Sequence, residues 1–389
     1  KMNTINMGMQ KDAEHIFKNH IIGNNEVKAV VFISSKSDNF IAGADIDMIK
    51  NTPNKSDLKT ITMQAHKFFD EIKSRNLPFV SAMNGAVMGG GLEWALYSDY
   101  RIITTNKKSI LSLPEVKLGL LPGMAGTYHL PKLIGIKESL GMILQGKNVR
   151  PDKAKKLGLV DLVVDESVLE QVAIQQAKGL IDGSVKINAG IDKHKFSLDR
   201  FMFFSPLRNY VFDEAKKTVL KAAGDKYPAP LAIIELLRDN LGKSKSQHID
   251  AESTLFAKLA DTNESSALIG LFHGSTAVKK HNFGKPSNEI KTVAVLGAGL
   301  MGAGVAQVSL DNGRYNVLLK DSNSQGLGRG MKTIDDALQK KLKKKSMTNY
   351  DYSLKTSNLV GLHDGSTSWK KHFSKADIVI EAVFEELSV

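Results

Sequence analysis

The sequence has no cysteine and no long apolar run. Without cysteine there is no disulfide framework, no thiolate metal site and no cysteine nucleophile. Any redox chemistry must therefore come from a cofactor. No apolar stretch reaches the roughly 18 residues that a membrane-spanning helix needs, so no transmembrane helix is predicted.

The length and composition are those of a folded protein with more than one domain. The 389 residues suggest two or three domains at roughly 100 to 200 residues each. Hydrophobic residues make up 42% and charged residues 24%, which excludes a disordered or fibrous chain. The net charge of +12 suits an anionic partner such as nucleic acid, acidic lipid or a phosphorylated substrate.

Strand and helix patterns alternate in the first part of the chain. A β-branched run at 27–35 and a second run at 78–82 have the length of buried strands. Between them, residues 57–75 show helical spacing of apolar side chains. Shorter strands are expected at 101–104 and 110–113, and a helix at 131–144 that is broken near Gly135. This alternation predicts an α/β domain at residues 1–165.

The strand signal fades after this domain. Residues 166–290 are predicted to be a helical linker region that packs between two domains, and the stretch 249–280 carries an apolar stripe. A new strand at 293–296 then begins a second α/β domain, predicted at residues 291–389.

The second domain opens with a dinucleotide-binding pattern. Gly297, Gly299 and Gly302 form G-x-G-x-x-G directly after a strand and at the start of a helix. The glycines allow a tight turn, an approach of the backbone to a pyrophosphate, and close packing of helix on strand. Asp321 lies at the end of the next predicted strand. In dinucleotide-binding domains, a carboxylate at this position binds the ribose hydroxyls of NAD and disfavours the 2′-phosphate of NADP. The pattern predicts NAD as the cofactor.

A later strand at 378–383 belongs to the same predicted sheet. The segment after it, Phe384 to Glu386, would lie at the carboxyl edge, where such sheets bind ligands. About 100 residues are too few for a two-halved Rossmann sheet, so we expect a partial, parallel, doubly wound domain.

Two glycine-containing turns and two glutamates in the first domain form a candidate site. Gly89–Gly91 and Gly43–Asp45 expose backbone N–H groups that could converge on one carbonyl oxygen as an oxyanion hole. Glu93 and Glu115 could divide acid and base roles beside it. Spacing alone leaves blander alternatives open, namely a flexible glycine loop and a glutamate that only stabilises a helix start.

Three segments resemble the enoyl-CoA hydratase, or crotonase, family. They are FIAGAD at 40–45, NGAVMGGGLE at 84–93 and PEVKLGLLPGMAGT at 114–127. Together with LGAGLMGAGVAQV at 296–308, their order is similar to that of multifunctional fatty-acid oxidation enzymes. The resemblance implies a crotonase-like ββα domain, a helical linker and then a partial Rossmann domain.

The resemblance assigns roles in the first domain. Ala44 and Gly90 match the positions whose backbone N–H groups bind the thioester oxygen of an acyl-CoA. Glu93 and Glu115 match the two catalytic glutamates that hold and activate water. The presence of both favours hydration over isomerisation, which commonly needs one carboxylate.

In the second domain, Met301, Asp321, Phe384, Glu385 and Glu386 match NAD-contacting positions of 3-hydroxyacyl-CoA dehydrogenases. The dehydrogenase histidine of the family is expected beyond Val389, and the first hydratase strand before the start of this chain. Both domains are therefore expected to be truncated.

Three residues, at two sites, depart from the family pattern. The usual P-G-A-G-G-T is Pro122 to Thr127 here, with Met124 and Ala125 in the third and fourth places. An alanine at a position that needs positive φ costs roughly 1 kcal/mol. Trp94 is bulkier than the usual aliphatic residue beside the first glutamate. Both changes would act on the acyl pocket more than on the carboxylates.

No metal is predicted, because His15, His66, His129 and His273 lack metal-ligand spacing and suit solvent or packing positions. The basic excess suits CoA phosphates first and peripheral contact with anionic lipid second, with no nucleic acid expected. The lysine run at 340–345 is typical of a solvated helix face. The resemblance implies a thiolase β subunit as partner in a hetero-oligomer, and a mitochondrial location at the matrix or inner membrane.

The sequence thus predicts a β-oxidation enzyme that hydrates trans-2-enoyl-CoA to 3-hydroxyacyl-CoA. In the full-length protein, NAD+ would then oxidise this product to 3-ketoacyl-CoA. Two alternatives stay open: an isomerase that converts 3-enoyl-CoA to 2-enoyl-CoA, and a non-catalytic crotonase-like scaffold that binds RNA or lipid. A salt-sensitive affinity for nucleic acid without hydratase activity would favour the scaffold.

Overall fold

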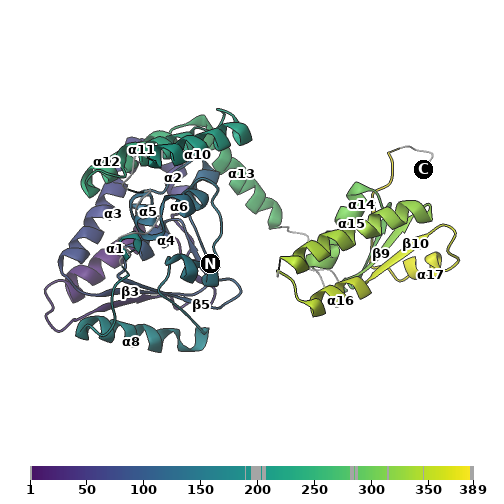
Figure 1. Cartoon of the computed structure of the whole chain (residues 1–389), viewed down its shortest axis with the longest axis horizontal. Helices are drawn as coiled ribbons and strands as arrows, with labels where there is room; N and C mark the ends of the chain where they lie inside the picture. The colour runs from purple at the N-terminus through teal and green to yellow at the C-terminus, as the bar shows by residue number, and fades with distance from the viewer. Residues whose placement is uncertain are drawn as a thin grey trace. The chain divides into compact units, whose positions relative to one another are not determined.

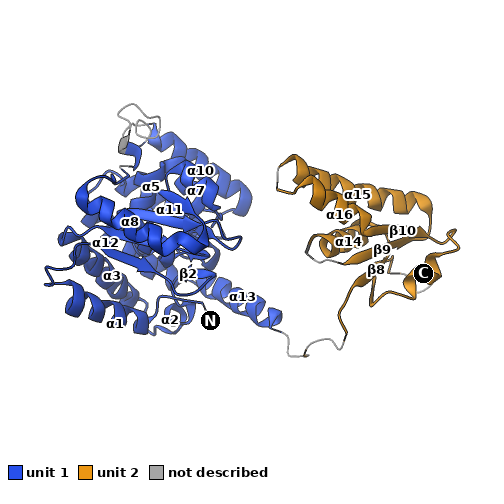
Figure 2. Ribbon diagram, turned by 90° about the horizontal axis from the view of Figure 1, so that it is seen from below, with its two compact units in different colours: residues 1–280 blue, residues 281–389 orange. Residues whose placement is uncertain are grey.

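The computed structural model describes residues 2–188, 190–193, 203, 207–280, 284, 288–312, 315–344 and 346–385. The chain forms two compact units, Lys1–Lys280 and His281–Val389 (Figure 2). The expected boundary at residue 165 falls inside the first unit. The described residues between 166 and 280, which belong to the linker predicted at 166–290, pack onto the first domain because their apolar faces are buried against it.

Unit 1 contains two parallel sheets that the chain visits in alternation. One sheet has the order β1-β3-β5-β7, with strands Val30–Ile33, Phe79–Met83, Tyr100–Thr104 and Leu162–Val164. The other has the order β2-β4-β6, with strands Asn39–Ile41, Ala86–Met88 and Ile110–Ser112. Successive strands thus enter different sheets before the next helix begins, which is the expected ββα arrangement.

The central strand β3 is buried over its whole length because both faces of its sheet are covered. Helix α8 (Leu169–Asp182) packs across one face, against β1, β3 and β5 (Figure 1). Phe79 and Met83 on the other face belong to the main hydrophobic core of unit 1. Burial on both faces explains why residues 78–82 do not alternate between apolar and polar side chains.

Among its described residues, unit 1 has eleven further α-helices. They are α1 (Met7–Ile16), α2 (Ile46–Asn51), α3 (Ser56–Ser74), α4 (Gly90–Leu96), α5 (Gly126–Ile134), α6 (Ile136–Ile143), α7 (Pro151–Leu157), α10 (Arg208–Ala223), α11 (Pro228–Asn240), α12 (Lys245–Ala260) and α13 (Asn263–Lys279). Short π and 3₁₀ helices occupy Phe17–Ile21, Glu115–Leu118, Glu166–Val168 and Gly190–Lys193. The predicted break at Gly135 separates α5 from α6, with φ 83° at the glycine.

The apolar stretch expected at 249–280 is two helices rather than one. Helix α12 begins with a capping box between Ser244 and Gln247, which satisfies N–H groups of its first turn. The chain breaks after Ala260, and the Thr262 side chain accepts from Ser265 N to start α13. Helix α12 packs against α3 and α5, so this late segment covers helices that form earlier in the chain.

Unit 2 has one parallel sheet in the order β10-β9-β8-β11. The strands are Thr292–Leu296 (β8), Asn316–Asp321 (β9), Leu359–His363 (β10) and Ile378–Glu381 (β11). The helices are α14 (Leu300–Asn312), α15 (Ser324–Lys343), α16 (Asn349–Ser357) and α17 (Trp369–Phe373). This is the partial Rossmann sheet that the sequence predicts. Of the helices in the described residues of both units, none has the length and apolarity to cross a bilayer.

Candidate active site

A mostly apolar cavity of about 430 Å³ lies in unit 1. The turn after β2, the start of α4 and the segment 114–124 contribute one part of its wall. The N-terminal residues between 2 and 10 and helices α2, α3, α12 and α13 contribute most of the rest, including Phe256 and Phe272. All four site residues predicted in this domain line the cavity: Ala44, Gly90, Glu93 and Glu115.

The predicted oxyanion pair consists of two adjacent backbone amides. Gly43 O and Asp45 N both bond to Ile5, at 2.9 Å each, so the amide of Ala44 between them faces the opposite side. Gly90 is the first residue of α4, and its N–H therefore has no acceptor within the helix. A Cβ built on Gly90 would lie 3.8 Å from Ala44 N, which places the two amides next to each other.

Glu93 extends from the first turn of α4 toward the start of α5. Its Oε1 accepts hydrogen bonds from Met124 N at 2.7 Å and Gly126 N at 2.8 Å. Burial raises the pKa of Glu93 to about 7, although these N–H groups act in the opposite direction. The carboxyl group therefore has comparable protonated and ionised populations near neutral pH.

Glu115 begins the 3₁₀ turn Glu115–Leu118 on the other side of the glycine run. Burial, and then the charge of Glu93, raise its pKa well above the ordinary value. Its Oε2 is buried and has no hydrogen-bond partner among the described residues. Its Oε1 lies 2.7 Å from where a Cβ on Gly89 would be, so any larger residue at 89 would displace this carboxyl.

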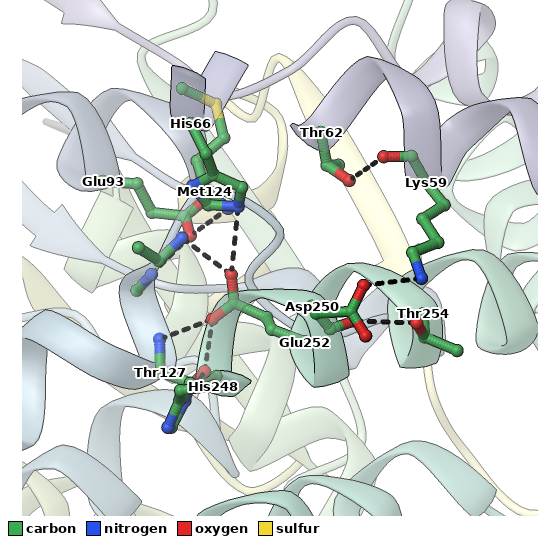
Figure 3. Close-up of polar contacts among 12 residues, drawn as sticks. Lys59, Thr62, His66, Glu93, Met124, Thr127, His248, Asp250, Glu252 and Thr254 are labelled. Carbon is green, nitrogen blue, oxygen red and sulfur yellow. Dashed lines mark hydrogen bonds and ion pairs between the residues drawn. The ribbon is translucent and has the colours of Figure 1, made fainter. Parts of the chain in front are cut away.

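A third buried glutamate, Glu252 of α12, lies beside this pair and was not predicted. Its carboxylate accepts from Ala125 N at 2.7 Å, from Thr127 N at 3.1 Å and from the Thr127 hydroxyl (Figure 3). Burial, and then the charge of Glu93, raise its pKa to about 8. One signal was available: Glu252 lies three residues after Ile249 and four before Phe256, within the buried stripe of an amphipathic helix.

The departures from the family pattern lie in different surroundings. Ala125 has φ 67°, the left-handed conformation that the sequence comparison suggested, and its side chain is buried. Trp94 does not line the cavity; it stacks on Phe32 with ring centroids 4.6 Å apart and meets Phe69 edge-on. The expectation that Trp94 alters the acyl pocket is therefore wrong, because its ring points into the aromatic core.

Two of the four histidines, His66 and His129, are buried and supply packing rather than charge. Burial lowers the pKa of His66 to about 4 and that of His129 to about 3, so both are neutral near pH 7. His15 is exposed, and His273 lies 3.4 Å from Asp47. Within the described ranges, no group of three or more histidine and acidic side chains is arranged to hold a metal ion.

The glycine turn of unit 2 has the geometry that a dinucleotide needs. Gly297 has φ 90°, and a Cβ on Gly302 would overlap the Gly297 carbonyl. Gly299 faces open space, with no atom within 4 Å of a Cβ built there. The pyrophosphate of NAD therefore fits against the backbone at Gly299.

Asp321 lies at the end of β9 beside this turn, and its Oδ2 accepts from Ala298 N at 2.9 Å. Partial burial would raise its pKa, but hydrogen bonds from Ala298 N and Asn323 N outweigh that effect and hold the pKa below the ordinary value. The carboxylate is ionised and partly exposed, as a group that binds ribose hydroxyls should be.

The other predicted NAD contacts lie at the same edge of the sheet. Met301 is exposed in the first turn of α14, and Phe384 and Glu385 are exposed just after β11. Strand β11 pairs with β8, which leads into the glycine turn, so the two segments are neighbours. Glu386 lies outside the described residues.

Comparison with known proteins assigns both units to families. Residues 1–196 match the family model described as enoyl-CoA hydratase/isomerase. Residues 292–389 match the 3-hydroxyacyl-CoA dehydrogenase, NAD binding domain. These matches confirm the predicted order of domains and the prediction of NAD as the cofactor of the second.

Two curated relatives are fatty acid oxidation complex subunits alpha from Shewanella species. The protein of Shewanella frigidimarina (strain NCIMB 400) is 37% identical over 397 residues, which cover 100% of this chain and 53% of that protein. The protein of Shewanella amazonensis (strain ATCC BAA-1098 / SB2B) is 37% identical over 392 residues, which cover 100% of this chain and 54% of that protein. The chain thus spans about half the length of the curated relatives it matches.

Among solved structures, the human mitochondrial delta3-delta2-enoyl-CoA isomerase matches with a TM-score of 0.50 and 18% sequence identity. The match covers 72% of this chain and 92% of that chain. At this identity the likeness shows the fold alone, and it confirms the crotonase-like architecture of unit 1.

Proposed function

The chain belongs to the enoyl-CoA hydratase/isomerase family, and on this premise we propose that unit 1 hydrates trans-2-enoyl-CoA thioesters in fatty-acid β-oxidation. One observation carries the proposal. Two buried carboxyl groups with raised pKa values, Glu93 and Glu115, line the same apolar cavity as the adjacent amides of Ala44 and Gly90.

The two amides would bind the thioester oxygen, where negative charge develops as water adds to C3. Glu93 is the better candidate for the base, because two N–H groups stabilise its ionised form. Glu115 is the better acid, because its pKa is raised further by the charge of Glu93 and its Oε2 is unpartnered. Water would lose a proton to Glu93, and C2 would receive one from Glu115.

Isomerisation of 3-enoyl-CoA is the second candidate, since moving a proton from C2 to C4 needs only one carboxylate. Two carboxyl groups in one cavity favour hydration. A scaffold without catalysis would gain nothing from these groups, because each buried carboxylate without a cation costs stability.

For unit 2, we propose that the whole protein oxidises the 3-hydroxyacyl-CoA product to 3-ketoacyl-CoA. NAD+ would supply the chemistry by accepting a hydride. Within this chain, the backbone at Gly299 would hold the pyrophosphate and Asp321 the ribose hydroxyls.

A thiolase β subunit is the partner we propose, because the curated relatives are named as alpha subunits of a complex. Peripheral contact with anionic lipid is supported only by the net charge of +12. A mitochondrial location rests on the resemblance alone and stays a prediction, since the two relatives named above are bacterial.

The test of the hydratase is Glu115→Gln in the full chain, followed by the loss of enoyl-thioester ultraviolet absorbance. We expect hydration turnover to fall by about 10²- to 10⁴-fold, the usual contribution of a positioned acid or base. Glu138→Gln is the matched control, because Glu138 is a surface residue paired with Lys153 at 3.3 Å.

Near-normal turnover of Glu115→Gln would contradict the assignment. Isomerisation of 3-enoyl-CoA is assayed on the same preparation. A wild-type protein that isomerises but does not hydrate would establish the alternative.

A further inference from the structure

The turn at the start of α5 is bound from two sides by two carboxylates. Four consecutive backbone N–H groups point alternately to each: those of Met124 and Gly126 bond to Glu93, and those of Ala125 and Thr127 bond to Glu252. Figure 3 shows the two carboxylates on either side of this turn. Neither set of donors can move without disturbing the other.

We propose that Glu252 is a positioning residue for the hydratase site: it fixes the turn at 124–127 so that two N–H groups converge on Glu93. The proposal rests on the hydratase function proposed above. It assigns the helical segment after residue 166 a direct part in shaping the catalytic site.

The turn needs such an anchor because its backbone is strained. Ala125 holds φ 67°, a conformation that costs a residue with a Cβ roughly 1 kcal/mol. The hydrogen bonds that Ala125 N and Thr127 N donate to the Glu252 carboxyl group on the far side oppose relaxation of this turn. Without them, the amides that bond to Glu93 would lose their fixed direction.

Glu252 is itself held in place. The Thr127 hydroxyl donates to its Oε2 and lies 2.9 Å from His248 Nε2, one turn earlier on α12. The side chain of Glu252 has no exposed surface, and α12 packs against both α3 and α5. The carboxylate therefore has a defined orientation rather than a choice of rotamers.

The decisive variant is Glu252→Gln in the full chain, which keeps the shape but places an NH₂ group among N–H and O–H donors. We expect kcat for enoyl-CoA hydration to fall about 10- to 100-fold with KM changed less than about twofold, since a small misplacement of a catalytic group has effects of this size. KM should change little because the variant does not alter the proposed acyl-CoA contacts at Ala44 and Gly90.

Asp250→Asn is the matched control on the same helix. Asp250 is exposed and pairs with Lys59 at 2.7 Å, so its loss should leave kcat within about twofold and the melting temperature nearly unchanged. Figure 3 shows both carboxylates of α12, one directed at the turn and one at Lys59.

A second pair of variants decides the matter if Glu252→Gln does not fold. Thr127→Val removes the hydroxyl that donates to Glu252, whereas Thr127→Ser keeps it. We expect the valine variant to lose kcat about 5- to 10-fold and the serine variant to stay within about twofold, and Glu252→Gln combined with Thr127→Val to lose no more than the worse single variant.

The proposal is overturned if Glu252→Gln and Thr127→Val both keep normal kcat, or if the serine and valine variants lose kcat equally. A loss of activity that only follows the folded fraction would also overturn it. These outcomes are separate from failure of the hydratase assignment, in which wild type does not hydrate or Glu115→Gln keeps normal turnover.

Discussion

Each unit places an acidic side chain beside a glycine turn that leads from a strand into a helix, yet the two environments shift the pKa in opposite directions. In unit 1, burial raises the pKa of Glu93 to about 7. In unit 2, hydrogen bonds to an acid that keeps some exposure lower the pKa of Asp321. A carboxyl group beside the same kind of turn thus has a raised pKa in one unit and a lowered pKa in the other.

The difference follows from access to water. An acid that must exchange a proton with a substrate near pH 7 needs a pKa close to that pH, which burial provides. An acid that only accepts hydrogen bonds from ribose hydroxyls needs to stay ionised, which partial exposure and backbone donors provide. The raised pKa of Glu93 and the lowered pKa of Asp321 therefore support the two roles proposed above, proton transfer and ribose binding.

The largest effect is expected from Gly302→Ala, because the new Cβ would overlap the Gly297 carbonyl. We expect NAD affinity to fall about 100-fold, equivalent to about 3 kcal/mol, while hydration by unit 1 is unchanged. Titration of NADH fluorescence measures the NAD affinity, and the hydratase assay measures hydration by unit 1. Gly304→Ala is the control, since a Cβ there meets no atom within 4 Å; equal losses in both variants would refute the steric reason.

A somewhat smaller effect is expected from Glu93→Gln on stability. Because folding raises the pKa of Glu93 from 4.5 to about 7, the wild-type protein loses stability as pH rises through that window. The variant lacks this penalty, so it should be more stable than wild type by on the order of 1–3 kcal/mol at pH 8 and gain little at pH 4. Denaturant unfolding at both pH values measures the difference in unfolding free energy between the variant and wild type. Replacing an acid whose pKa is not raised on folding would not stabilise the protein at pH 8.

Asp321 in unit 2 should show the opposite pH dependence to Glu93, because its pKa is lowered on folding. Asp321→Asn should weaken NAD binding about tenfold, the value of about one hydrogen bond to a charged group. Because its pKa is lowered on folding, the wild-type carboxylate stabilises unit 2 above its unfolded pKa and loses this effect as pH falls through the folded pKa. Calorimetric titration with NAD+ measures the affinity; an unchanged affinity would mean that the ribose is bound elsewhere.

The smallest effect concerns Ala125→Gly. Relief of the positive φ gains about 1 kcal/mol, but loss of a fully buried methyl group costs about 0.8 kcal/mol. We expect the free energy of unfolding to change by less than about 0.5 kcal/mol, measured by denaturant titration. A gain well above 1 kcal/mol would show that the methyl group packs poorly.

The sequence predicts what is encoded locally. The strands at 78–82 and 293–296 and the helix break at Gly135 follow from short-range patterns, and the structure confirms them. Pairing of Glu93 with Glu115 required the family resemblance, because spacing alone left it undecided. Strand β10 was missed because Leu359–His363 is only partly buried and includes a glycine.

Glu252 could not be paired with Thr127 from local patterns, since 125 residues separate them. The sequence showed only an acid among apolar positions of a helix. The segment 166–290 was predicted to be a linker for the same reason: helical periodicity identifies an apolar face but not the surface that the face covers.

That long separation also bears on synthesis of the chain. The segments that carry Glu93 and Glu115 leave the ribosome well before α12 does. During synthesis, the turn at 124–127 is therefore complete before the Glu252 carboxyl group that binds it has been translated. On the hydratase function proposed above, nascent unit 1 would carry Glu93 and Glu115 early and reach full turnover only once α12 docks.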